Sequence, residues 1–103
     1  MGQAAGGHVM SKSLFSDERE CWLCHSPEVH KHHVYPGNGR RQISEREGCW
    51  LYLCPAHHNM GEFGVHFDRQ LDLAIRQECQ RRWMESNEAT ADEFREIFGC
   101  SYL

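Results

Sequence analysis

The order of apolar and polar residues predicts a strand-rich first part and a helical remainder in this chain of 103 residues. Residues 29–35 (VHKHHVY) favour extended backbone through their Val and Tyr content, and strong turn formers follow them. Residues 49–53 (CWLYL) give the clearest strand signal, so the two segments predict an antiparallel hairpin. The polar residues 40–48 are interpreted as the connection between them. Pro55 suits the first turn of a short helix that begins near Cys54.

Two helices are predicted after this hairpin. Over residues 67–85 the apolar positions recur at steps of three and four, the period of an amphipathic helix. These positions are Phe67, Leu71, Ala74, Ile75, Cys79 and Trp83. Residues 90–93 (TADE) have the form of a capping box, and they predict a second helix whose Phe94, Ile97 and Phe98 pack inward before Gly99 ends it. The tail, residues 100–103, is expected to dock on the fold.

Length and composition favour one α+β domain. The apolar share of 40% is ordinary for a globular chain, and the Gly/Ala-rich residues 1–12 are interpreted as a disordered leader. We therefore expect a single domain over residues 13–103, with a metal-binding core at about 20–68 and a helical part at about 67–103. The start of the chain has neither the basic residues nor the apolar run of a signal peptide or membrane anchor, so a cytoplasmic protein without a membrane partner is expected.

Four residues have the spacing of a closed tetrahedral metal site. Cys21 and Cys24 form one C-x2-C half, and Cys54 and His57 form the other. In a reducing compartment the six Cys residues of this chain are poor candidates for disulfides. Structural zinc is therefore the favoured interpretation, and the alternative is a set of buried thiols beside a surface histidine.

The remaining histidines suggest a second site. His30, His32 and His33 lie on the first predicted strand, whereas His58 and His66 flank the start of the long helix. A structural zinc with four ligands leaves these side chains unused. They are either surface and core histidines or the parts of a reactive centre, and the adjacent pair together with two further histidines favours the second interpretation.

These residues resemble the HNH, or ββα-metal (His-Me finger), nucleases with their treble-clef-like fold, and in particular the small nucleases of bacteriophages and prophages. The resemblance covers about residues 21–66. Its core is His32-His33-Val34-x-Pro36-Gly37 followed by Leu53-Cys54-Pro55-Ala56-His57-His58-Asn59. The fold it implies is a small zinc-stabilised core of an antiparallel hairpin and a short helix, followed here by a long amphipathic helix and a short C-terminal helix.

The resemblance implies roles for single residues. His33 matches the general base of the family, and His32 and His58 match ligands of a catalytic divalent ion. His66 is the candidate third ligand, with Glu62 as its rival. The middle Asn of the family falls near Cys49, which lacks the hydrogen bonds of an amide. A backbone carbonyl, Asn38 or Asn59 would then replace it, or Cys49 is simply a small buried residue and the base is poorly oriented.

The implied activity is metal-dependent hydrolysis of phosphodiester bonds in DNA by an endonuclease or nickase. Imidazole ligands favour Mn²⁺, Ni²⁺, Co²⁺ or Zn²⁺ over Mg²⁺. The net charge of −4 argues against nonspecific wrapping of nucleic acid. A local basic patch is still expected to hold phosphates, from Lys31, Arg40, Arg41 and Arg69.

Partners beyond DNA are phage or host DNA-processing proteins, and a homodimer would bring one site to each strand. The alternative function is a zinc module on the same fold that binds nucleic acid or a protein without cutting. That alternative accounts for the four zinc ligands but leaves the other histidines unexplained.

Overall fold

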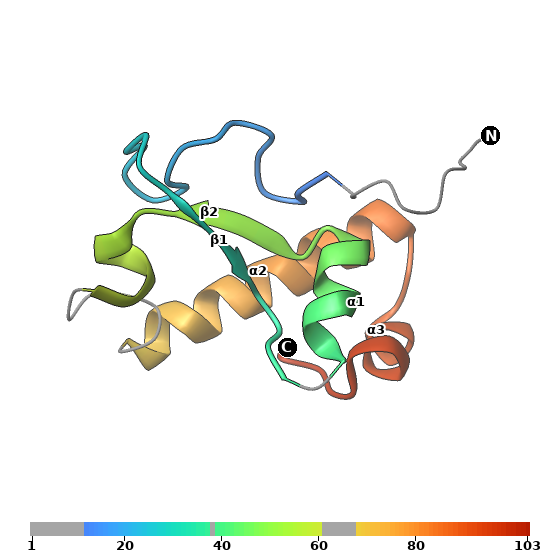
Figure 1. The fold of residues 1–103 in the computed structure, drawn as a ribbon. Coiled ribbons are helices and arrows are strands. Elements are labelled where there is room, and N and C mark those ends of the chain that lie inside the picture. Colours follow the sequence, from blue (N-terminus) through green and yellow to red (C-terminus); the bar gives the residue numbers. More distant parts are fainter. Residues whose placement is uncertain (1–11, 38, 61–67) are drawn as a thin grey trace.

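Two short antiparallel strands lie at the centre of the fold (Figure 1). The structure is a computed structural model, and it describes residues 12–37, 39–60 and 68–103. Strand β1 (His30–His33) pairs with β2 (Trp50–Leu53), with His30 opposite Leu53 and His33 opposite Trp50. The predicted hairpin is confirmed, although β1 is shorter than the expected 29–35. Together with its helices, the hairpin makes a small α+β fold.

The interpretation of residues 40–48 as a polar connection is wrong, because they form helix α1 (Arg40–Glu47) between the two strands. The hydrophobic pattern does not indicate this helix, because Ser44 is its only buried residue and Gly39, at its start, provides no side-chain cap. Tertiary contacts hold it instead. The Ser44 hydroxyl donates to the carbonyl of Tyr35 and accepts from its N–H, each at 3.3 Å.

Gly48 ends α1 in a left-handed conformation that disfavours side chains, with φ of 79°. A Cβ atom there would lie 2.4 Å from the carbonyl oxygen of Lys12, so the close approach of the N-terminal segment also requires glycine. The Leu14 N–H donates to the carbonyl of Gly48 at 2.9 Å. The chain thus turns sharply from α1 into β2.

A single π-helical turn, η1 (Ala56–Met60), follows β2 immediately after Pro55. The N–H groups of His57 and His58 both reach the carbonyl of Cys54, at 3.0 and 2.8 Å. The short helix predicted near Cys54 is therefore confirmed, in a wider π form. Its turn brings His57 and His58 back beside the end of the hairpin.

Helix α2 (Arg69–Asn87) runs behind the hairpin in Figure 1 and confirms the predicted long helix. The Asp68 carboxylate caps its start by accepting from the N–H of Leu71 at 3.0 Å. Of the expected inward positions, Ile75, Cys79 and Trp83 are buried. Leu71 is half-buried and Ala74 is exposed, so the buried stripe begins one turn later than predicted, and Phe67 lies outside the described residues.

Helix α3 (Ala91–Phe98) starts at the predicted capping box, with Thr90 and Glu93 exchanging hydrogen bonds, and ends at Gly99. Its Phe94 and Phe98 stack at 4.3 Å between ring centroids, and both rings lie against Tyr35. Ile97 is partly buried against the core. This aromatic cluster joins α3 to the segment that leaves β1.

The C-terminal tail docks as expected. The Tyr102 ring stacks on Tyr35 at 5.2 Å between centroids, and the buried Gln80 amide bonds to the Tyr102 N–H at 2.7 Å and to the Ser101 hydroxyl at 2.9 Å. Of the predicted leader, only Lys12 is among the described residues. None of the helices in the described part of the chain has the length and apolar character to cross a membrane.

Candidate metal centre and basic cleft

Cys21, Cys24, Cys54 and His57 form a cluster whose potential ligand atoms all lie within 4.8 Å of one another. The Sγ atoms of Cys24 and Cys54 are 3.6 Å apart, and the Nδ1 atom of His57 lies 3.6 Å from Cys21 Sγ and 3.3 Å from Cys54 Sγ. Around a tetrahedral zinc ion, two sulfurs are separated by about 3.8 Å and a sulfur from a nitrogen by about 3.5 Å. The cluster therefore fits such an ion, as the spacing predicted.

Local hydrogen bonds favour a thiolate at Cys21. Burial raises the pKa of this thiol. Hydrogen bonds from the backbone of Cys54, Cys24 and Leu23 and from the ring of His57 together outweigh burial and lower the pKa to about 6. At Cys24 a backbone hydrogen bond from Ser26 lowers the pKa, whereas burial and the neighbouring Cys54 and Cys21 raise it, so the net pKa lies above its usual value. A bound cation would hold all three cysteines as thiolates and balance their charge.

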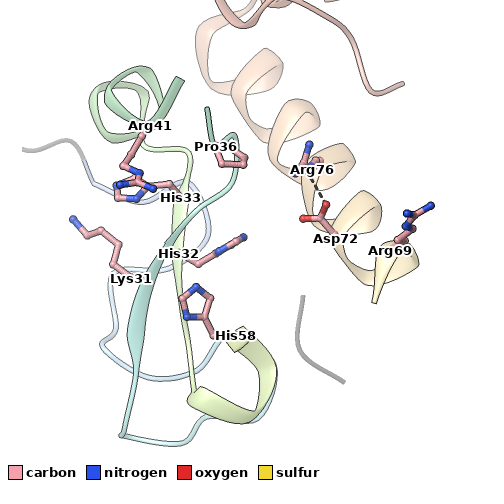
Figure 2. Close-up of a pocket in the computed structure, with 9 residues that line it drawn as sticks. All are labelled: Lys31, His32, His33, Pro36, Arg41, His58, Arg69, Asp72 and Arg76. Carbon is pink, nitrogen blue, oxygen red and sulfur yellow. Dashed lines mark ion pairs between the residues drawn. The ribbon is translucent and has the colours of Figure 1, made fainter. Parts of the chain in front are cut away.

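The alternation of β1 divides its side chains between two faces. His30 and His32 both lie against the ring of His58, with centroids 5.5 and 5.2 Å from it. Lys31 and His33 point the other way, and both contact Glu45 of α1. Figure 2 shows His32 directed toward His58 and His33 directed toward Arg41. Nevertheless β1 ends at His33, and the rings of His32 and His33 both border one cleft.

This cleft has a volume of about 600 Å³ and lies between β1, η1, α1 and the start of α2 (Figure 2). Its lining residues are Lys31, His32, His33, Pro36, Arg41, His58, Arg69, Asp72 and Arg76. Six of these were predicted as site residues from the sequence, and they come from four separate segments. The fold thus brings together the base candidate, two ligand candidates and three of the basic residues.

The electrostatic balance of the cleft is positive. Arg76 Nε pairs with Asp72 at 3.0 Å and Lys31 Nζ pairs with Glu45 at 3.0 Å, so these charges are compensated. Arg41 and Arg69 are exposed, and neither makes an ion pair within the described residues. The cleft therefore presents two uncompensated guanidinium groups, which suit an anionic ligand.

Three other predicted residues are placed elsewhere or not described. The Arg40 guanidinium lies against Gly99 after α3, so Arg40 does not line the cleft although it adjoins Arg41 in sequence. His66 and Glu62, the two candidates for a third ligand, lie outside the described residues. His30 supplies an imidazole that sequence reasoning did not assign, with its Nδ1 atom 3.4 Å from Nδ1 of His58. Its position two residues before His32 could have identified it, because residues two apart on a strand share a face.

Glu45 is the second residue that sequence reasoning missed. Its Oε1 atom lies 2.8 Å from Nε2 of His33, and its two oxygens lie 3.2 and 3.0 Å from Nζ of Lys31. Burial raises the pKa of this carboxyl, but the hydrogen bonds and charges of His33 and Lys31 outweigh burial, so the net pKa lies below its usual value. Glu45 is therefore ionised at neutral pH. No sequence signal identified it because α1 was interpreted as a connection.

Cys49 is a buried core residue, in agreement with the plainer of the two interpretations of this position. Its side chain is fully buried. A hydrogen bond with Cys79 raises the pKa of its thiol, and burial raises it as well. Its carbonyl accepts from the N–H of Val34 at 3.0 Å. Neither Asn38 nor the side chain of Asn59 is among the described parts of the chain.

A scan against protein-family models and searches of curated proteins and of solved structures gave no significant match to this chain.

Proposed function

We propose that this chain is a metal-dependent DNA endonuclease or nickase of the HNH type, with a structural zinc ion at the Cys3His cluster. The observation that carries the proposal is the basic cleft, in which His33, His32 and His58 lie beside Arg41 and Arg69, which form no ion pair with any residue that the structure describes. A cleft with imidazoles and uncompensated guanidinium groups has the chemistry that phosphodiester hydrolysis requires.

One pair of histidines has a spacing that suits a divalent ion. The Nδ1 atoms of His30 and His58 are 3.4 Å apart, which is about the separation of two imidazole nitrogens on one tetrahedral ion. His32, on the same face of β1, is the further candidate ligand. A bound ion would polarise the phosphoryl group and stabilise the charge on the departing 3′ oxygen. Imidazole donors favour Mn²⁺, Ni²⁺, Co²⁺ or Zn²⁺.

His33 is assigned as the general base. It removes a proton from the attacking water while the new phosphorus–oxygen bond forms and the bond to the 3′ oxygen breaks. Base catalysis of this kind contributes about a hundred- to ten-thousand-fold in rate. Arg41 and Arg69 hold the phosphates beside the scissile bond, whereas the charge of Lys31 is balanced by Glu45.

Nicking of supercoiled plasmid tests the assignment. Wild-type protein, His33→Ala and His25→Ala are compared in the presence of each divalent metal in turn. His25 is a matched control because it is exposed and pairs with Glu20 rather than lining the cleft. We expect cleavage by wild type and His25→Ala and a loss of at least about a hundredfold in His33→Ala. Equal cleavage by all three proteins would refute the base assignment, and plasmid binding without cleavage would favour the non-catalytic zinc module.

A further inference from the structure

We infer that Glu45 is a positioning residue for His33, because it fixes the proton on one ring nitrogen and leaves the other free to accept a proton from water. This inference rests on the proposed function of the cleft. It concerns a residue of α1, the helix inserted between the two strands.

The hydrogen bond determines which ring nitrogen is the base. An ionised carboxylate only accepts, so the Nε2 atom of His33, 2.8 Å from Glu45, carries the proton. Nδ1 then keeps its lone pair when the ring is neutral. This arrangement of base and orienting carboxylate is the one that activates nucleophiles in many hydrolytic sites.

The carboxylate is itself held in place from two directions. Lys31 Nζ bonds to both of its oxygens, and the same ammonium group lies 4.2 Å from the centroid of the Trp50 ring. The side chains of His33 and Glu45 are only 22% and 29% exposed, so solvent screens their interaction less than it screens an open surface pair. Glu45 therefore has one well-defined position relative to the ring.

The backbone beneath Glu45 is anchored to the segment that follows His33. The adjacent Ser44 is fully buried and bonds to both the N–H and the carbonyl of Tyr35. Tyr35 in turn donates from its hydroxyl to the carbonyl of Arg76 at 2.7 Å. The helix, the end of β1 and α2 are thereby linked, and the distance between Glu45 and His33 is set by buried contacts rather than by surface side chains.

An ordinary ion pair with Lys31 is the competing role for Glu45. Three variants separate the two roles: Glu45→Ala, Lys31→Met and the control Glu96→Ala, which removes an exposed glutamate of α3. Each is measured as the zinc-loaded full chain. The first readout is the Nε2–H proton resonance of His33 in NMR spectra, which is visible only while a hydrogen bond protects that proton from exchange with water. The second is plasmid nicking, resolved into kcat and KM.

We expect wild type, Lys31→Met and Glu96→Ala to retain the proton resonance and Glu45→Ala to lose it. Removal of such an orienting partner typically lowers activity about 10- to 100-fold, and here the loss should appear in kcat with little change in KM. Retention of the resonance in Glu45→Ala would overturn the inference. A loss of kcat in Lys31→Met equal to that in Glu45→Ala would also overturn it, because the carboxylate would then act through Lys31. If wild type does not nick plasmid, the proposed function fails, while the resonance still decides whether Glu45 orients His33.

Discussion

Replacement of Cys24 by serine tests whether this cysteine is a metal ligand or an ordinary thiol. Cys24 suits the test because it is exposed to solvent, whereas Cys21 and Cys54 are buried. Its side chain lies 3.6 Å from Cys54 Sγ. If no metal binds, the substitution exchanges one small exposed group for another, and such surface changes alter stability by no more than about 0.5 kcal/mol. A bound ion makes the same change severe.

The expected magnitude follows from the four-ligand geometry. A structural zinc site provides an apparent binding free energy of about 10–16 kcal/mol, and most of it is available only to the folded chain. A whole small domain is typically stable by about 5–15 kcal/mol. Cys24→Ser removes one of the three thiolates that the cluster offers, so we expect a loss of more than about 4 kcal/mol and a largely unfolded protein.

Urea unfolding followed by far-ultraviolet circular dichroism measures this loss under reducing conditions, and elemental analysis measures the zinc content. Cys100→Ser is the matched control, because Cys100 is partly buried but lies outside the cluster. We expect the control to keep one zinc per chain and nearly the wild-type midpoint, and we expect a chelator to bring wild type to the state of Cys24→Ser. Equal midpoints for Cys24→Ser and wild type, with no effect of the chelator, would refute the metal site.

Three further predictions concern stability. Phe94→Ala should cost about 3–5 kcal/mol in urea unfolding, because the ring is fully buried among aromatic neighbours, and a cost under about 1 kcal/mol would contradict that packing. Thr90→Ala should lower the free energy of unfolding by about 1 kcal/mol by removing the cap of α3, whereas Ser86→Ala, at an exposed position of α2, should change it little. The pKa of Glu45 lies below its usual value in the fold, so its ionised form stabilises the protein above the unfolded pKa of about 4.3, and this contribution disappears as the pH falls through the lower folded pKa. The difference in unfolding free energy between wild type and Glu45→Gln should therefore shrink as the pH falls from about 4.3 through the lower folded pKa, and a constant difference would contradict the pKa direction.

Local signals in the sequence were sufficient for much of the fold and for the metal cluster. The spacings of Cys21 with Cys24 and of Cys54 with His57 imply two half-sites, and the strand pairing then brings the halves together. The cap at Thr90 was predictable because a capping box depends only on residues within one turn. Each half-site and the helix cap depends only on residues that are close together in the sequence.

Helix α1 was not predictable in the same way, because its stability comes from residues distant in the chain. It has no apolar stripe. Its buried residue Ser44 attaches it to the fold through hydrogen bonds with Tyr35. Glu45 was consequently missed, although its carboxylate lies 2.8 Å from the ring nitrogen Nε2 of His33. Register on β1 had a similar effect, since His30 rather than His33 shares a face with His32.

The charge of the whole chain was also a poor guide to the cleft. Many acidic groups lie on α2 and α3, where they pair with neighbouring arginines: Glu78 with Arg82 at 2.7 Å, and Asp92 with Arg95 at 2.7 Å. These pairs do not involve Arg41 or Arg69, which form no ion pair among the described residues. Because salt screens charges beyond about 10 Å, an anionic strand near the cleft responds to these two guanidinium groups more than to the distant acids. A net charge of −4 is therefore compatible with phosphate binding at this one surface.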